Sequence, residues 1–276
     1  MNRFTEDSME YVVIKIGTET LMNDGSPNEK VMRNVAKCVA KIRERGMGVI
    51  LVSSGAIGHA LSTLSEDVAA QMKGKKQALS ALGQPDLMED WRRHFRKHNI
   101  RCAQGLVEDH DFETEDGREN MRRTIRELHE LEVLWEAQGK KRKKKKKRAL
   151  LILNGNDFVT HGPIDSDNDR IAGKVAEIIG ATRVVFLTDV NGLYNGHPDD
   201  EDSRLISDVQ VGHLDCQQYI REKRSENSTG GMGGKCTAAE SVVRSNPDAV
   251  VHICRGRVRN AIMKALKGKI GTRFHS

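Results

Sequence analysis

The stretch Tyr11-Val-Val-Ile-Lys-Ile-Gly-Thr18 is an apolar, β-branched run that stops at a glycine, and it predicts a buried strand. Three more runs of the same kind cover residues 48–53, 149–153 and 183–187. All four end in small or polar residues, which are Gly17-Thr18, Ser54-Gly55, Asn154-Gly155 and Thr188-Asp189. In open α/β sheets, ligands bind outside the carboxyl ends of the strands. Together the four strand ends therefore predict one site.

Helix signals lie between these runs. Residues 26–29 (Ser-Pro-Asn-Glu) have the pattern of a capping box with proline at the first helical position. Apolar residues follow at helical spacing up to Ile42, and Gly46 closes the helix. Pro85 interrupts the helical stretch 74–98, so we expect two helices or a kink there. The alternation of strand and helix predicts βαβ units and therefore an α/β fold.

A second informative stretch is Ser228-Thr-Gly-Gly-Met-Gly-Gly-Lys235. Glycine leaves room for a ligand, and such a loop can direct several backbone N–H groups at an oxyanion. A helix-compatible pattern follows, so the helix dipole and Lys235 would face the same anion. It is not a Walker A loop, which needs Gly at 229 and Ser or Thr at 236, where this chain has Thr229 and Cys236. The pattern predicts a phosphate site; the alternative is a flexible surface loop.

Charged residues raise two further questions. Lys15 lies near the end of an apolar strand, where it either meets a counter-charge or points harmlessly outward. Residues 165–169 (Asp-Ser-Asp-Asn-Asp) place three carboxylates together, which repel one another unless cations neutralise them. A solvated turn or the N-cap and acidic first turn of a following helix are the alternatives. A calcium loop of the EF-hand type is excluded, because the closing Glu is absent.

Composition limits the remaining possibilities. The formal net charge is +6, and the run Lys140-Lys-Arg-Lys-Lys-Lys-Lys-Lys-Arg148 contributes nine positive charges, which leaves −3 without it. Such a run is typical of a solvated insertion, with nucleic-acid, acidic-membrane or nuclear-targeting roles as alternatives. The chain has no transmembrane run and no signal-peptide core, and its five scattered cysteines suit reduced thiols and predict a cytoplasmic protein. No metal-ligand spacing is visible.

The ordered segments Val-Val-Ile-Lys-Ile-Gly-Thr, Val-Ser-Ser-Gly-Ala-Ile-Gly, Asn-Gly-Asn-Asp, Ser-Asp-Asn-Asp, Leu-Thr-Asp-Val-Asn-Gly-Leu-Tyr and Thr-Gly-Gly-Met-Gly-Gly-Lys resemble the motifs of the amino-acid kinase family. Residues 75–84 and 91–95 resemble the glutamate-phosphorylating members in particular. The resemblance implies a three-layer αβα sandwich around a mainly parallel sheet. It implies one kinase domain over residues 1–276, with an N-terminal substrate lobe and a C-terminal nucleotide lobe. A basic insertion interrupts it at about 138–148, and no C-terminal RNA-modification-type domain is expected.

The function that the resemblance implies is phosphoryl transfer from ATP, with Mg²⁺, to the γ-carboxylate of L-glutamate, the first step of proline biosynthesis. The implied catalytic residues are Lys15, Lys235 and Asp169, with Asp169 orienting both lysines. The implied glutamate-binding residues are Ser54, Gly55, Asp157 and Asn168. The implied nucleotide-binding residues are Thr188, Asp189, Thr229, Gly230, Gly231, Met232, Gly233, Gly234 and Lys235. No protein metal site is implied, and a homo-oligomer, dimer or tetramer, is expected.

Some residues depart from the family pattern. The family usually has glutamate where Gly155 stands, glycine where Ser166 stands, a proline-flanked aspartate where His197 stands, and leucine, serine and alanine where Ile171, Ala172 and Gly173 follow Arg170. These changes fall on the acceptor side. Two alternatives therefore stay open: a sister kinase acting on another small acid or phosphate, and a non-catalytic regulatory paralogue that binds nucleic acid through residues 140–148. The retained lysines and Asp169 argue against the second.

Overall fold

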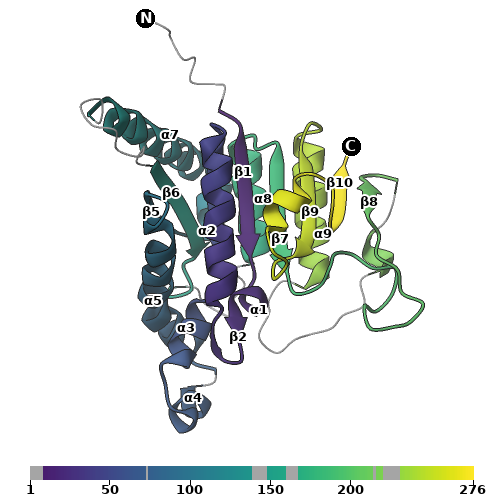
Figure 1. Cartoon of the computed structure of the whole chain (residues 1–276), viewed down its shortest axis with the longest axis horizontal. Helices are drawn as coiled ribbons and strands as arrows, with labels where there is room; N and C mark the ends of the chain where they lie inside the picture. The colour runs from purple at the N-terminus through teal and green to yellow at the C-terminus, as the bar shows by residue number, and fades with distance from the viewer. Residues whose placement is uncertain (1–8, 73, 139–147, 160–166, 214–215, 220–230) are drawn as a thin grey trace, which may run out of the picture.

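The computed structural model describes residues 9–72, 74–138, 148–159, 167–213, 216–219 and 231–276. Eight strands of this part form one sheet in the order β5-β6-β4-β1-β7-β9-β10-β8 (Figure 1). They are β1 (Tyr11–Ile16), β4 (Gly48–Ser53), β5 (Ile100–Val107), β6 (Arg148–Gly155), β7 (Arg183–Thr188), β8 (Asp208–Gln210), β9 (Val250–Arg255) and β10 (Thr272–His275). The β9–β10 pair is antiparallel and every other pair is parallel. A separate antiparallel pair joins β2 (Met22–Asn23) to β3 (Ser26–Pro27).

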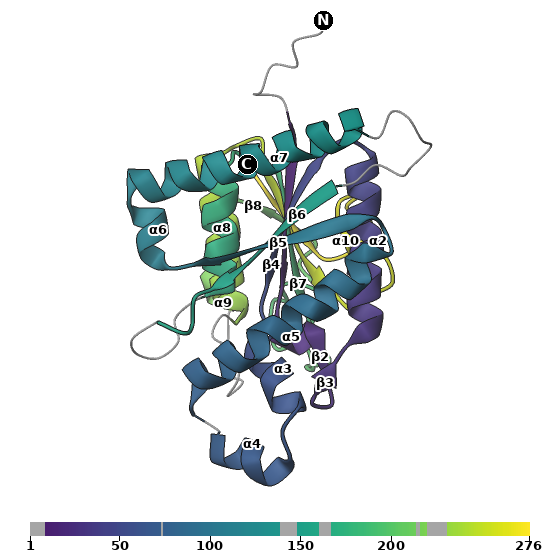
Figure 2. The same cartoon turned by 90° about the vertical axis from the view of Figure 1, so that its left-hand side faces the viewer.

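Helices cover both faces of the sheet, as the edge-on view in Figure 2 shows. One core packs the sheet against α2 (Glu29–Glu44), α5 (Lys76–Arg96) and α10 (Ala261–Ala265). The other packs it against α7 (Glu115–Gln138), α8 (Asn168–Ile178) and α9 (Met232–Ser245). Short helices are α1 (Thr18–Leu21), α3 (Ala56–Ser62), α4 (Glu66–Met72), α6 (Asp109–Glu113) and the 3₁₀ turn η3 (Cys216–Tyr219). The predicted three-layer αβα sandwich is confirmed. No helix in the described ranges is long and apolar enough to cross a membrane.

The central strand β1 sets the side on which Lys15 lies. Val12, Ile14 and Ile16 belong to the core shared with α2, and Val13 belongs to the core shared with α8 and α9. Side chains alternate between the two faces of a strand. Lys15 therefore shares its face with Val13 and points toward α8 and α9.

The four predicted strands are confirmed as β1, β4, β6 and β7, but two helix predictions are wrong in detail. Residues 26–27 do not start α2; they pair with β2. The helix begins at Glu29, and Asn28, itself a favourable cap residue, accepts a hydrogen bond from the backbone N–H of Val31 at 3.2 Å.

The expected break at Pro85 is also absent, since α5 is one continuous helix. Proline removes only the hydrogen bond to the carbonyl of Ala81, and that residue is exposed, so water can take its place. Leu79, Leu87 and Trp91 are buried on either side of the proline, so both halves of α5 are packed against the rest of the protein and the division into two helices does not occur.

Candidate active site

The site lies where β1, β4, β6 and β7 end. Backbone hydrogen bonds fix the strand ends to one another: Ser54 N–H donates to Ile16 O at 3.1 Å, and Gly17 N–H donates to Leu187 O at 3.4 Å. Helix α8 starts close to these ends, because its first residue Asn168 donates to Ser54 Oγ at 2.8 Å. The prediction that the four strand ends meet at one place is therefore confirmed in geometry.

At the centre, Asp169 lies between two lysines. Its Oδ1 is 2.7 Å from Lys15 Nζ, and its Oδ2 is 3.0 Å from Lys235 Nζ. Asp169 is fully buried, and the two lysines are 5% and 8% exposed. The counter-charge expected for Lys15 is thus present, and the outward-pointing alternative is excluded. Two cations and one carboxylate leave one net positive charge in a nearly dry position, which suits an anionic ligand.

Burial and neighbouring charges perturb two groups here. Burial lowers the pKa of Lys15, and the attraction of Asp169 offsets part of this change. Burial and the negative charge of Asp169 raise the pKa of Asp167. Asp167 is the N-cap of α8, where its Oδ1 accepts the backbone N–H of Asp169 at 2.9 Å. The N-cap alternative for the acidic segment is therefore correct for Asp167, while Asp169 meets the two cations.

The glycine-rich segment leads into α9, as predicted. Gly231 precedes the helix without a side-chain cap, and Met232, Gly233 and Gly234 form its first turn. The N–H groups of such a turn have no partner within the helix. A Cβ at Gly234 would lie 2.9 Å from Asp167 Oδ2, so the Asp167 side chain would have to shift where α9 approaches α8. Thr229 and Gly230 lie outside the described residues.

On the β4 and β6 side, a relay of side-chain amides fixes Asn168. Its Nδ2 donates both to Ser54 Oγ and to Asn154 Oδ1, the latter at 2.9 Å. Asn154 Nδ2 in turn donates to Gln84 Oε1 of α5 at 2.9 Å. The relay leaves Asn168 Oδ1 buried and without a hydrogen-bond partner among the described residues. An acceptor that is held in place and unpaired is suited to a ligand that donates hydrogen bonds.

Two further predicted residues lie near this relay. Asp157, which is 9% exposed, accepts a hydrogen bond from Ser80 Oγ of α5 at 3.1 Å. Gly55 caps α3 with a φ of 110°, a conformation that favours glycine. Asn154, Gln84 and Ser80 were not predicted as site residues. The only signal for the latter two was that residues 75–84 fit one branch of the family.

Thr188 and Asp189 follow β7. Thr188 Oγ1 donates to Asp189 Oδ1 at 3.0 Å, and Thr188 O accepts the backbone N–H of Gly256 at 2.8 Å. Thr188 is buried and Asp189 is exposed. The pair directly follows Leu187, whose carbonyl oxygen accepts a hydrogen bond from the backbone N–H of Gly17.

The departures from the family pattern fall on two sides of the site. Gly155 ends β6 beside the amide relay, and its N–H donates to Asn154 Oδ1 at 3.0 Å. Arg170 is half-exposed on α8 and pairs with Asp109 Oδ1 at 2.5 Å. His197 lies beyond β7, near Asp199. Ser166 is outside the described residues.

Residues 10–254 match the model of the amino acid kinase family. A glutamate 5-kinase of Enterococcus faecalis is 30% identical over 95% of this chain and 93% of its own length. A glutamate 5-kinase of Methanosarcina barkeri is 32% identical over 99% of this chain and 70% of its own length. A carbamate kinase from Giardia lamblia bound to AMP-PNP superimposes with a TM-score of 0.63 at 16% identity, over 98% of this chain and 99% of the other. A UMP kinase from Ureaplasma parvum superimposes with a TM-score of 0.61 at 14% identity, over 98% of this chain and 100% of the other. These two structures support the fold.

Proposed function

Since this chain belongs to the amino acid kinase family, we propose that it transfers the γ-phosphoryl group of ATP to the γ-carboxylate of L-glutamate and forms an acyl phosphate. The observation that carries the proposal is the buried arrangement in which Asp169 joins Lys15 and Lys235 at the strand ends. The relatives named glutamate 5-kinase support glutamate as the acceptor. Its product would enter proline biosynthesis.

The chemistry needs little beyond alignment and charge. A carboxylate is already a nucleophile, so no general base is required, and two anions must be brought in line. Lys15 and Lys235 would offset the charge on the transferred phosphoryl group. Asp169 acts through them, because its two oxygens hold the two ammonium groups at a fixed separation. Fixed charges of this kind favour the transition state without reorganisation.

The acceptor would be bound by Ser54, Gly55, Asp157 and Asn168. The unpaired Oδ1 of Asn168 and the carboxylate of Asp157 both suit the α-ammonium group of glutamate. Both residues are held by neighbours rather than by the ligand, so the site is organised before glutamate arrives.

The nucleotide would lie between β7 and α9. Thr188 and Asp189 are assigned to the nucleoside, and residues 229–235 to the phosphates, which the free N–H groups at the start of α9 would bind. Among the described residues, no group of three or more His, Cys, Asp or Glu could hold a metal ion. Both oxygens of Asp169 are also engaged by lysines. Mg²⁺ therefore fits as part of the substrate MgATP, held by phosphates and water, where it neutralises phosphate charge.

The wider organisation is also proposed. One kinase domain would hold the acceptor with β4, β6 and α5, and the nucleotide with β7 and α9. None of the five cysteines forms a disulfide, which supports a reducing compartment such as the cytoplasm. A dimer or tetramer is expected from the family.

The test of the function is turnover with a panel of acceptors. Purified protein, MgATP and hydroxylamine should yield a hydroxamate with L-glutamate, because hydroxylamine traps an acyl phosphate. Aspartate, acetylglutamate, a carbamate and isopentenyl phosphate serve as competing acceptors, with ADP release as the common measurement. If one of these turns over while glutamate does not, the proposed acceptor is wrong and the alternative sister kinase is correct.

The proposed lysine roles are tested by kinetics. Lys15→Ala and Lys235→Ala should each lower kcat by about 100-fold or more while changing the KM for glutamate little, because a group that meets developing charge is worth roughly 3 kcal/mol. Lys174→Ala on α8, which removes an exposed lysine paired with Glu177, is the matched control and should leave kcat unchanged. Near wild-type kcat in Lys235→Ala would remove that residue from the mechanism.

A further inference from the structure

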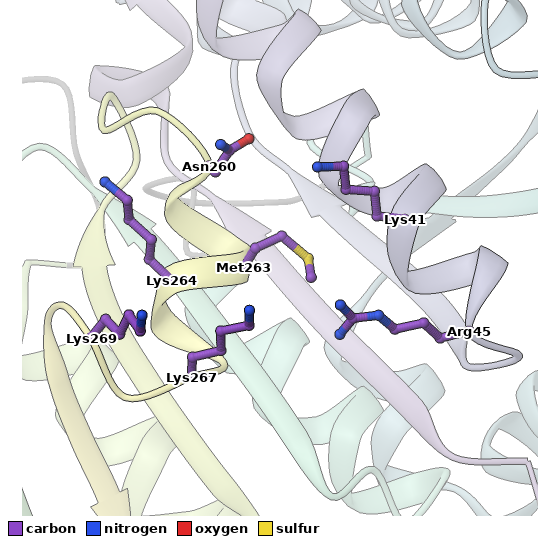
Figure 3. Close-up of a pocket in the computed structure, with 7 residues that line it drawn as sticks. All are labelled: Lys41, Arg45, Asn260, Met263, Lys264, Lys267 and Lys269. Atoms are coloured by element: carbon purple, nitrogen blue, oxygen red, sulfur yellow. The ribbon is translucent and has the colours of Figure 1, made fainter.

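A second concave site lies between α2 and α10. It is a cavity of ≈ 300 Å³ lined by Lys41, Arg45, Asn260, Met263, Lys264, Lys267 and Lys269 (Figure 3). Lys41 and Arg45 extend from α2 toward α10, and Lys267 extends toward them (Figure 3). Met263 is only 9% exposed and forms the apolar floor. The lining residues include five cations and no carboxylate.

This cavity is remote from the active site. Helix α2 starts after the carboxyl end of β1 and ends just before the amino end of β4, which is parallel to β1. Lys41 and Arg45 belong to the final turns of α2. They therefore lie toward the amino ends of the strands, whereas Lys15 and Asp169 lie at the carboxyl ends of the strands.

The cavity cations are not neutralised by ion pairs, unlike several arginines elsewhere on the surface. Arg93 pairs with Asp90 and Glu29, and Arg122 pairs with Glu115 and Glu119. Further pairs hold the guanidinium groups of Arg170, Arg183, Arg244 and Arg273. None of the five cations of the cavity has an ion pair within the part of the chain that the structure describes. Single surface lysines such as Lys30 and Lys37 also lack an ion pair among the described residues, so the distinguishing feature here is that five unpaired cations line one cavity without a carboxylate.

Helix dipoles do not neutralise these cations either. Helix α2 ends at the cavity, and the short helix α10 runs along it from its N-cap Asn260 to its last turn at Lys264; cations near a helix C-terminus are favourable. Each C-terminus is equivalent to about half a negative charge, so the two together offset about one of the five positive charges. Lys267 and Lys269 also come after the last turn of α10. Most of the positive charge is left for a ligand.

We propose that this cavity binds a small anion with two or three linked phosphates. The ligand must be extended, because the cations approach from two helices rather than from one. Two linked phosphates carry about three to four negative charges, on the guide of −1.5 to −2 per phosphate group, which is comparable to the positive charge of Lys41, Arg45 and Lys267, whose side chains point inward. A volume of ≈ 300 Å³ is at the lower end of small-molecule sites and is too small for a folded macromolecule.

Two methionines can report the two sites separately. Met263 lies in the cavity, and Met232 lies in the first turn of α9, at the proposed phosphate loop. The full chain is labelled with methyl-¹³C methionine, and both signals are assigned with Met263→Leu and Met232→Leu. Pyrophosphate and tripolyphosphate are titrated without divalent cations at low salt. The expected result is a saturable shift of the Met263 signal, with tripolyphosphate binding tighter than orthophosphate. The reporters also separate this proposal from the proposed function, because failure at Met263 leaves the Met232 site untouched.

Paired variants test the contacts. Arg45→Gln/Lys267→Gln should weaken pyrophosphate binding at Met263 by about tenfold or more, since charge-assisted hydrogen bonds are each worth more than 1.4 kcal/mol. Lys30→Gln/Lys37→Gln removes the same charge from α2 outside the cavity and should change the affinity less than about twofold. Both double variants should keep wild-type turnover, which also shows that they fold.

Further titrations identify the kind of molecule that supplies the phosphates. ADP and pyrophosphate carry the same number of phosphates, so tighter ADP binding at Met263 indicates a nucleotide and equal or weaker binding indicates an inorganic anion. Citrate controls for negative charge alone. The proposal is overturned if only Met232 responds, if citrate binds tighter than pyrophosphate, or if the two double variants lose affinity equally.

Discussion

The substitution Asp169→Asn tests the central arrangement most directly. It keeps the shape of the side chain and removes the only carboxylate that contacts both buried lysines within the described residues. At an effective dielectric constant of about 20, each lysine–carboxylate attraction near 3 Å is worth about 5 kcal/mol before the cost of desolvation. Removing one partner of a buried ion pair typically costs about 3–5 kcal/mol of stability. Burial already lowers the pKa of Lys15. In the variant, Lys15 can therefore lose its proton, which keeps the loss of stability within this range.

The expected result is a lower melting temperature and a lower turnover. For a chain of 276 residues, a loss of 3–5 kcal/mol corresponds to about 6–10 °C, at about 2 °C per kcal/mol. The kcat should fall by about 100-fold or more, because both lysines lose their fixed positions. Calorimetry with and without a non-hydrolysable ATP analogue adds a specific signature. The phosphates replace the missing negative charge, so the difference in melting temperature from wild type should narrow when the analogue is bound.

Asp167→Asn is the matched control. It removes the same charge two residues earlier, and asparagine is as good an N-cap as aspartate. The pKa of Asp167 is raised by burial and by Asp169, so its charged form is already disfavoured and stability should change little. Equal melting shifts for the two variants, or an Asp169→Asn protein with wild-type kcat, would refute the argument that Asp169 holds the two lysines.

Three further predictions concern other parts of the chain. Gly234→Ala should raise the KM for ATP, since its Cβ would lie 2.9 Å from Asp167 Oδ2, whereas Gly231→Ala, with open space around it, should have a smaller effect in the same steady-state assay. Burial, with Arg273 and Arg183 nearby, lowers the pKa of His252 to about 4, so the unfolded chain binds the extra proton between pH 6.5 and 4 and stability falls as the pH drops through this window. Between pH 7 and pH 4, the free energy of unfolding, measured with denaturant, should fall by about 3 kcal/mol less in His252→Gln than in wild type. Equal decreases would contradict the burial of a neutral imidazole. Replacing residues 140–147 by a short glycine-serine link, with Arg148 kept because it pairs with Ile100, should preserve kcat while removing any salt-sensitive retention on heparin; a folded variant without turnover would assign the run to the active site or the oligomer.

The strands of the fold could be predicted because their signal is local. β1, β4, β6 and β7 are buried on both faces and appear as unbroken apolar runs. The edge strand β5 is different, because exposed residues interrupt it and no apolar run marks it. Helix starts were less predictable. The residues before α2 satisfy a capping pattern, yet the β2–β3 pair uses them, and only the tertiary fold decides between these alternatives.

The residues of the site also differ in how well the sequence predicts them. The partner of Lys15 is 154 positions away in the sequence, and the resemblance identified it because the acidic segment is itself a motif. Gln84 and Ser80 carried no such signal, since a polar residue on a helix is usually solvated. Both are buried where the first half of α5 contacts the end of β6 and the residues that follow it.

The two halves of the site rely on different physical interactions. On the phosphate side, the ammonium groups of two buried lysines each lie within 3.0 Å of one carboxylate oxygen of Asp169, and loss of any one charge leaves a buried charge unpaired. On the acceptor side, neutral amides form a relay in which Asn168 donates to Asn154 and Asn154 donates to Gln84. Such a relay fixes the direction of the side-chain carbonyl of Asn168, but it does not require a particular charge on the ligand. Neutral residues beside the relay can therefore change at a lower cost in stability than the buried charges can. Of the departures from the family pattern, Gly155 lies beside the relay, Arg170 lies on the exposed face of α8 and His197 lies beyond β7, whereas none replaces a lysine or the aspartate of the charged trio.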